Sequence, residues 1–168
     1  MRPRSLLRTG ACPCGSSRVN RFSVRLYDSK PNKFTPAHSS KNLAELVCSN
    51  SLKSNDPATA HGLLKAELRV MGSKVLAAAD ECAVPAGSAL AVDRKRFSAL
   101  VTERVRAESN ITIINETAED IPDGLVIVAT GPLTLAPLDG RIAKLFGSLH
   151  FFDAEAPIIS ADSVDMSK

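Results

Sequence analysis

The sequence predicts an α/β fold built on a parallel β-sheet, and three features lead to that prediction. Four apolar residues, Val126 to Ala129, end abruptly in Thr130-Gly131-Pro132, as a buried parallel strand ends in a tight turn. Ile111 to Ile114 is a β-branched run typical of a second strand. Between the predicted strands lie segments whose apolar residues recur at helical spacing.

The first half of the chain alternates short elements with loops. Val24 to Tyr27 is predicted to be a short strand. Residues 32–41 are predicted to be loop, because the prolines at 31 and 36 stop regular structure. Leu43 to Cys48 is expected to be a helical turn, and Asn50 to Pro57 a polar loop. The apolar residues between Gly62 and Ala79 are spaced so that they would lie on one face of a helix, which predicts a single helix of about four or five turns.

The second half continues the same order. Val84 to Val92 mixes small apolar residues with proline and glycine, so we expect a loop and a short strand. Asp93 is placed to cap a helix that carries Phe97 and Val101 on one face. Ala136 to Phe146 is expected to be a helix. No internal repeat and no low-complexity tract interrupts this pattern.

Composition limits the classes of protein that the chain can belong to. Its 168 residues suffice for one ordinary core, and 44% of them are apolar. No apolar run approaches the roughly 20 residues of a membrane helix, so we expect no membrane partner. The net charge of +3 arises because residues 1–27 hold six arginines and no acid. The rest of the chain is net negative, so its bulk is not a basic nucleic-acid surface.

The four cysteines form neither a disulfide framework nor a metal site. They stand at positions 12, 14, 48 and 82, without the spacing of a small secreted domain. Cys12-Pro13-Cys14 leaves one residue between the thiols, which is too close for the usual metal-ligand spacing. We therefore expect no metal, and we expect Cys82 to be structural.

Six segments, taken in chain order, resemble one protein family. They are Val24 to Pro31, Thr35-Pro36-Ala37-His38, Leu43 to Leu52, Val84 to Arg94, Ile127 to Pro132, and Ala154 to Met166. Together they resemble the FAD- and folate-dependent tRNA (uracil-5-)-methyltransferases (TrmFO), relatives of the glucose-inhibited division protein A group. The resemblance covers about Val24 to Lys168.

The resemblance implies a fold, cofactors and a reaction. The fold is the FAD-binding Rossmann-like domain of the flavoproteins with two dinucleotide-binding domains. The complete family protein takes a methylene group from methylenetetrahydrofolate, passes it through reduced FAD, and delivers a methyl group to a uridine in the T-loop of tRNA. NADPH reduces the flavin. The partners implied are tRNA and the folate substrate, and the location implied is the cytoplasm.

Both ends of the chain depart from that family pattern. In the family, a first strand and a Gly-x-Gly-x-x-Gly turn precede the strand at Val24, but residues 1–23 lack this fingerprint. A frame error or wrong start, a transit peptide, and a divergent N-terminus are all open explanations. We expect residues 24–168 to be a partial FAD-binding domain that lacks its first strand and its C-terminal part. Such a chain should bind FAD poorly, aggregate along its exposed inner strand edges, and methylate no tRNA.

Three candidate site residues each have a structural alternative. Asp28 follows a strand, where an acid can accept hydrogen bonds from the adenosine ribose, or it is an ordinary turn residue. Lys30 stands where the family has Arg and keeps the charge without the bidentate fork. Cys48 follows Leu-Val and precedes Ser-Asn-Ser, so it is either a buried small hydrophobe or a functional thiol. The resemblance implies that Cys48 lies beside the flavin as one of two functional cysteines.

The remaining candidates come from the same motifs. His38 is a ligand-binding residue or a loop histidine with a local hydrogen bond, and the loop at residues 87–94 either contacts FAD or builds a turn and a helix cap. The resemblance implies cofactor binding by Ser49, Asn50, Gly87, Ser88, Asp93, Arg94, Thr130 and Gly131.

The sequence leaves three function classes open. The first is the folate- and FAD-dependent tRNA methyltransferase. The second is a non-catalytic remnant of such a protein. The third is an unrelated FAD- or NAD-dependent oxidoreductase that shares only the Ala-Thr-Gly strand end, and the runs Leu46 to Leu52 and Pro85 to Arg94 argue against it.

Overall fold

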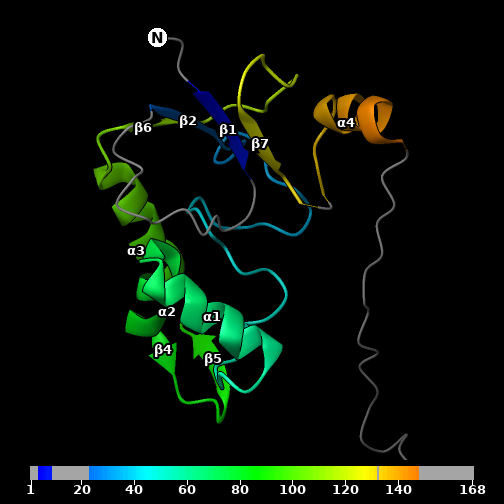
Figure 1. Cartoon of the computed structure of the whole chain (residues 1–168). Helices are drawn as coiled ribbons and strands as arrows, with labels where there is room; N and C mark the ends of the chain where they lie inside the picture. Colours follow the sequence, from blue (N-terminus) through cyan, green and yellow to red (C-terminus); the bar gives the residue numbers. More distant parts are fainter. Residues whose placement is uncertain (1–3, 9–22, 132, 148–168) are drawn as a thin grey trace, which may run out of the picture.

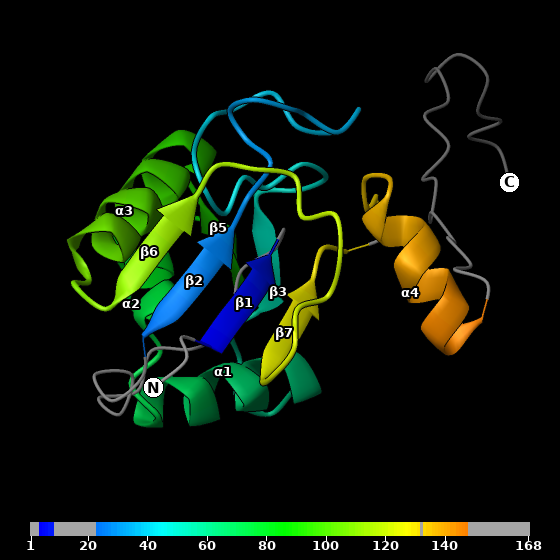
Figure 2. The same cartoon turned by 90° about the horizontal axis from the view of Figure 1, so that it is seen from above.

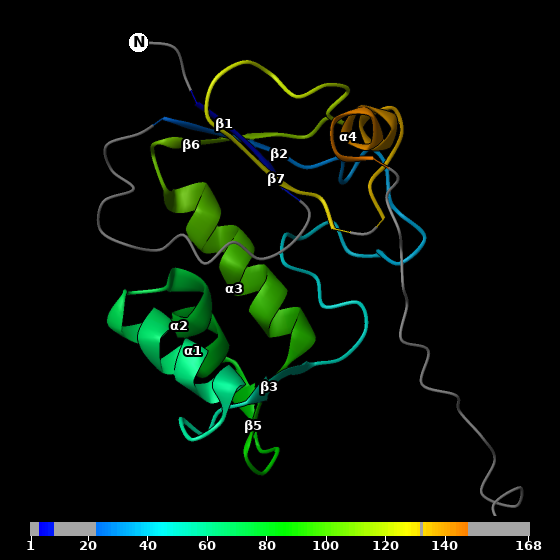
Figure 3. The same ribbon diagram turned by 45° about the vertical axis from the view of Figure 1, so that its right-hand side comes forward.

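Two β-sheets, joined by helices, make up the structure. The computed structural model describes residues 4–8, 23–131 and 133–147, with the backbone alone for residues 4–8. A four-stranded sheet lies at one end of the molecule and a three-stranded sheet at the other (Figure 1). Helix α3, Arg94–Ala107, runs from the smaller sheet toward the larger one (Figure 3).

The larger sheet is parallel and has the strand order β6-β2-β1-β7. Its strands are β1, Arg4–Arg8; β2, Val24–Tyr27; β6, Ile111–Ile114; and β7, Val126–Ala129. Figure 2 shows the four strands side by side and pointing the same way. The predicted α/β class and three of the four strands are therefore confirmed.

The prediction that the first strand is absent was wrong. Strand β1 lies in the centre of the sheet and pairs with both neighbours, with Leu6 opposite Leu26 and Ile127. Sheet pairing uses backbone N–H and C=O groups, so two neighbouring strands can accept a short segment whose residue pattern is a weak strand signal. We expected aggregation because the inner strand edges would be exposed. That reason no longer holds, since β1 covers those edges.

The smaller sheet is antiparallel and has the order β3-β5-β4. It consists of β3, Ser51–Ser54; β4, Ala83–Val84; and β5, Ala89–Val92. Strand β3 lies where the sequence predicted a polar loop, and that prediction was wrong because β3 is fixed by backbone pairing to β5. Gly87, with a φ of 60°, makes the turn between β4 and β5.

The helix expected over residues 62–79 is two helices. Helix α1 is Ala60–Val70 and α2 is Lys74–Glu81. Gly72 has a φ of 73°, which ends the first helix. The Ser73 hydroxyl accepts a hydrogen bond from the backbone N–H of Leu76 and caps the second helix. The apolar pattern therefore continues across a break between two helices. The last described helix, α4, is Leu138–Phe146.

The main core lies between α2, α3 and β5. Phe97 and Val92 are each 1% exposed, and both belong to the buried cluster that includes Leu76 and Leu90. Cys82 is also 1% exposed in this cluster, which confirms that it is a structural residue. The core therefore fixes the start of α3, and with it the loop before α3. Among the described helices, none has the length and apolar character needed to cross a membrane.

Candidate functional site

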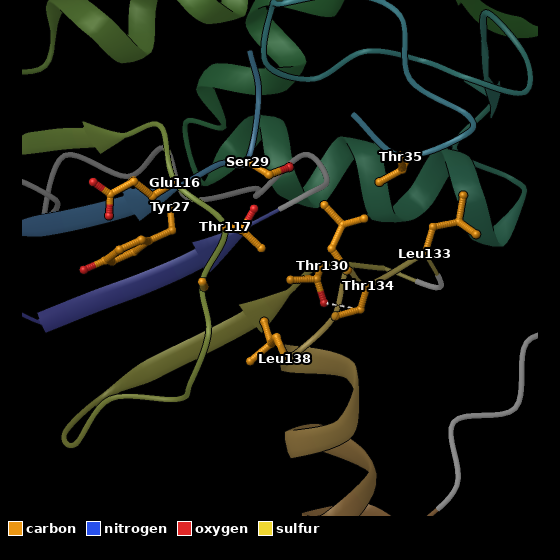
Figure 4. Close-up of a pocket in the computed structure, with 11 residues that line it drawn as sticks. Tyr27, Ser29, Thr35, Glu116, Thr117, Thr130, Leu133, Thr134 and Leu138 are labelled. Atoms are coloured by element: carbon orange, nitrogen blue, oxygen red, sulfur yellow. Dashed lines mark hydrogen bonds between the residues drawn. The ribbon is translucent and has the colours of Figure 1, made fainter. Parts of the chain in front are cut away.

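A pocket lies at the carboxyl edge of the parallel sheet. It is lined by Tyr27 and Ser29 from the end of β2, by residues that follow β6, and by residues that follow β7 (Figure 4). A wider groove of about 700 Å³ shares part of this lining and extends to Asn32 and Asp120. In open α/β sheets, ligands bind at this edge, where the strand order reverses around the central strand.

The turn after β7 is held by two threonines. The hydroxyls of Thr130 and Thr134 lie 2.6 Å apart (Figure 4). Thr134 Oγ1 donates to the carbonyl oxygen of Gly131 at 2.9 Å. Gly131 has a φ of 70°, which a side chain would strain. The predicted strand-to-glycine turn is thus formed, and it faces the pocket through Thr130.

Asp28 lies directly beyond β2 and is 5% exposed. Its backbone N–H donates to the carbonyl oxygen of Ile114 at 3.0 Å, which extends the pairing of β2 with β6 by one residue. Its Oδ1 accepts a hydrogen bond of 2.9 Å from the backbone N–H of Lys30. Asp28 is therefore not a solvated turn residue, and its buried carboxylate is fixed at the sheet edge.

Lys30 is also buried, with 7% of its side chain exposed. Its Nζ donates to the carbonyl oxygen of Asn42 and lies 4.0 Å from a carboxylate oxygen of Glu45. The carboxylate of Glu45 accepts hydrogen bonds from the backbone N–H groups of Ser39 and Ser40 and from the Ser39 hydroxyl, at 3.0 to 3.2 Å. These contacts join the end of β2 to the segment that leads to Cys48.

The surroundings of Glu45 favour its ionised form. Burial by itself raises the pKa of the Glu45 carboxyl, but the hydrogen bonds from Ser39 and Ser40 and the nearby Lys30 ammonium outweigh it, and the pKa lies below 4.5. The ionised carboxylate therefore contributes to the stability of this segment.

We expect that contribution to depend on pH. A carboxyl group whose pKa is lower in the folded chain stabilises the fold when ionised, so the contribution is complete above 4.5 and is lost as the pH falls below it. The melting temperature of the native chain should exceed that of Glu45→Gln above this pH, and the two should converge under acid conditions. A constant difference between about pH 3 and pH 6 would contradict the assignment.

His38 makes a local contact. Its Nδ1 lies 2.5 Å from the hydroxyl of the buried Thr35, and its backbone N–H donates to the Thr35 carbonyl oxygen at 3.1 Å. This is the local hydrogen bond of the loop interpretation. Thr35 also lines the pocket at the sheet edge, so the Thr-Pro-Ala-His turn borders that pocket.

Cys48 is exposed in the described part of the chain, so it is not a buried small hydrophobe there. Its segment turns at Leu43–Ala44 without forming a helix, so the predicted helical turn is not helical. Ala44 has a φ of 53°, a conformation that costs free energy for a residue with a Cβ atom. The Arg94 guanidinium donates to the carbonyl oxygen of Cys48 at 3.3 Å. A cation is thus fixed close to the backbone of the thiol-bearing residue.

The other predicted site residues build the frame around Cys48. Asn50 bonds to Val92 through both backbone and side chain, at 2.9 and 3.3 Å. Ser49 Oγ accepts from the N–H of Ser51 at 3.0 Å, and the Ser88 carbonyl accepts from Asn55 at 2.7 Å. Asp93 caps α3 by accepting from the N–H groups of Lys95 and Arg96, each at 3.0 Å, which confirms the predicted cap.

The candidates therefore form two groups. The first group lies at the parallel sheet and consists of Asp28, Lys30, His38, Thr130 and Gly131. The second group lies around β3, β5 and the start of α3 and consists of Cys48, Ser49, Asn50, Gly87, Ser88, Asp93 and Arg94. The segment 39–48 connects the groups. Sequence reasoning did not single out Glu45, Thr134 or Thr102, a residue of α3 whose hydroxyl accepts from the N–H of Leu43. Isolated polar residues of this kind carry no positional signal. Among the described residues, no cluster of His, Cys, Asp and Glu could hold a metal ion.

Comparison with known proteins shows the family. A family model described as glucose inhibited division protein A matches residues 16–168. The chain belongs to the glucose-inhibited division protein A family. The FAD-binding Rossmann-like fold class predicted from the sequence agrees with this membership and with the mixed α/β architecture.

Curated relatives are identical to the chain at about half of the aligned positions. The methylenetetrahydrofolate--tRNA-(uracil-5-)-methyltransferase TrmFO of Bacillus subtilis (strain 168) is 54% identical over 149 residues, which is 88% of this chain. The protein of the same name from Lactiplantibacillus plantarum is 55% identical over 148 residues, or 87% of the chain. In both comparisons the chain spans 34% of the relative's length. The resemblance stated from the sequence motifs is thereby confirmed.

Proposed function

We propose that this chain supplies the flavin-binding part of an FAD-dependent enzyme that methylates carbon 5 of uracil in tRNA, with methylenetetrahydrofolate as the one-carbon donor. The observation that carries the proposal is the sheet edge, where Tyr27, Ser29 and Thr130 line one pocket at the switch point of a parallel sheet. Asp28 and Gly131 are the sequence neighbours of these lining residues. The names of the relatives, together with identities above 50%, supply the reaction.

The residues at the sheet edge fit the adenosine half of FAD. The buried carboxylate of Asp28 at the end of β2 is the acceptor that a ribose hydroxyl requires, and Gly131 lets ligand approach the backbone without a Cβ clash. Tyr27 and Ser29 line the same pocket. Bound FAD would supply the electron and one-carbon chemistry, while the protein positions it. NADPH as reductant, tRNA as partner and a cytoplasmic location belong to the same proposal.

We expect the chain with its own N-terminal residues to bind FAD weakly. The residues after β1 lack the Gly-x-Gly-x-x-Gly spacing that brings the pyrophosphate to a helix N-terminus. Residues 9–22 lie outside the described part of the chain, so this expectation and the division at residues 23 and 24 remain predictions. Flavin fluorescence titration tests it, and a tight stoichiometric complex would contradict it.

A hybrid enzyme tests the proposed function. Residues 24–147 would replace the matching segment of the Bacillus subtilis relative, which then contributes the glycine turn and the rest of its chain. We expect the hybrid to transfer labelled carbon from methylenetetrahydrofolate to uracil in tRNA. A folded, flavin-containing hybrid that oxidises NADPH without methylating tRNA would favour a general oxidoreductase instead.

A further inference from the structure

The segment that carries Cys48 is attached to the rest of the protein at several points. The Asn42 carbonyl accepts from the Lys30 ammonium, and the N–H of Leu43 donates to the Thr102 hydroxyl of α3 at 2.9 Å. Thr102 is 4% exposed, and its hydroxyl in turn donates to the Ser98 carbonyl oxygen at 2.7 Å. The segment is therefore fixed to the parallel sheet by one contact and to α3 by another.

Lys30 is the basic residue of this arrangement, and Glu45 is its acidic partner. With 7% of its side chain exposed, its ammonium group faces the segment that carries Asn42 and Glu45. Burial of an ammonium group is costly unless hydrogen bonds and an opposite charge compensate it, and the Asn42 carbonyl and the Glu45 carboxylate provide both. In its described contacts, the Lys30 ammonium group therefore interacts with groups of the protein itself.

We propose that Lys30 is a positioning residue that holds the Cys48 segment against the end of β2, rather than a residue that binds FAD through its ammonium group. The proposal takes the role of Cys48 from the proposed function. The contacts of Lys30 do not depend on that function. Asp28 and Lys30 are two residues apart, and the Asp28 carboxylate bonds to the Lys30 backbone. One short stretch therefore links the predicted ribose-binding carboxylate to the thiol segment.

Ala44 provides independent support for a positioned segment. Its φ of 53° lies in the left-handed region, and such strain persists only where surrounding contacts determine the conformation. The contacts of Asn42, Leu43 and Glu45 lie on either side of that residue. Loss of the Lys30 contact should therefore loosen this stretch and leave the helices unchanged.

Amide hydrogen exchange in the hybrid enzyme tests the proposal. In Lys30→Met, we expect exchange in residues 39–48 to rise by about tenfold or more, with α3 and β2 unchanged. Lys30→Arg should restore protection, because it retains a buried cation that can donate to Asn42. Lys33→Met is the matched control, since Lys33 is an exposed lysine three residues away, and it should change nothing. FAD affinity should fall less than twofold in Lys30→Met.

The opposite pattern would overturn the proposal. Unchanged exchange in Lys30→Met together with a large loss of FAD affinity would assign the ammonium group to the cofactor. If Lys30→Met does not fold, Glu45→Ala removes the acidic partner from the same network. Unchanged exchange of the Ser39 and Ser40 amides in that variant would refute the proposal. Failure of the hybrid to methylate tRNA would reject the proposed function and leave the exchange result standing, so the two failures can be distinguished.

Discussion

Replacement of Cys48 by alanine in the hybrid enzyme is expected to abolish methylation of tRNA, with a loss on the order of a thousandfold or more. Cys48 is exposed and is not a member of the main core cluster, so its removal should leave the fold and the flavin content intact. A thiol needs thiolate character to react, and Arg94 bonds to the backbone of the same residue. The loss should therefore appear in turnover.

The second cysteine of the described residues is the control for that experiment. Cys82 is 1% exposed within the main core, so Cys82→Ala should lower the free energy of unfolding by about 1 kcal/mol and leave turnover per folded enzyme unchanged. Both variants are compared by melting temperature, flavin content and methyl incorporation on one preparation. Full methylation by Cys48→Ala would remove the catalytic role.

The second large effect is expected at Gly62, which is buried near the start of α1. A Cβ atom there would lie 1.8 Å from the carbonyl oxygen of Asp56, which is a backbone atom and cannot rotate away. That carbonyl also accepts hydrogen bonds from the N–H and the hydroxyl of Thr59, the N-cap of α1. Gly62→Ala should therefore displace the loop before α1 and lower the free energy of unfolding by about 3 kcal/mol.

Gly140 gives the matched comparison, because it is a helical glycine with open space around it. Apart from its chain neighbours and the backbone of its own helix, no heavy atom in the described part of the chain lies within 4 Å of a Cβ built at Gly140 in α4. Gly140→Ala should be neutral or stabilising by up to about 1 kcal/mol, since alanine has the higher helix propensity. Chemical denaturation of both variants measures the difference. Equal stability of Gly62→Ala and the native chain would show that the Asp56 loop moves freely.

The sequence predicted those parts of the fold whose signals are local. The β-branched run at Ile111–Ile114 and the apolar run at Val126–Ala129 both form strands, and Asp93 caps α3 as expected. Strands β1 and β3 were missed, because Arg4–Arg8 and Ser51–Ser54 show no strand pattern and are fixed by pairing with distant strands.

The candidate site was predictable as a set of residues but not as an arrangement. The motifs indicated Asp28 and Cys48, and the structure places the first buried at the sheet edge and the second exposed near α3. The contact between Lys30 and the Asn42 carbonyl depends on the path of a loop with no regular structure, which no periodicity reveals. The roles of these residues remain proposals.

The FAD affinity of the hybrid enzyme tests the central claim, that the carboxyl edge of the parallel sheet binds the adenosine half of the cofactor. Asp28→Asn removes the charge from the buried carboxylate at the end of β2, and Asp123→Asn does the same at an exposed loop position. We expect Asp28→Asn to weaken FAD binding by about tenfold or more and Asp123→Asn to leave it unchanged. Equal FAD affinity in the two variants and the unmodified hybrid would contradict it.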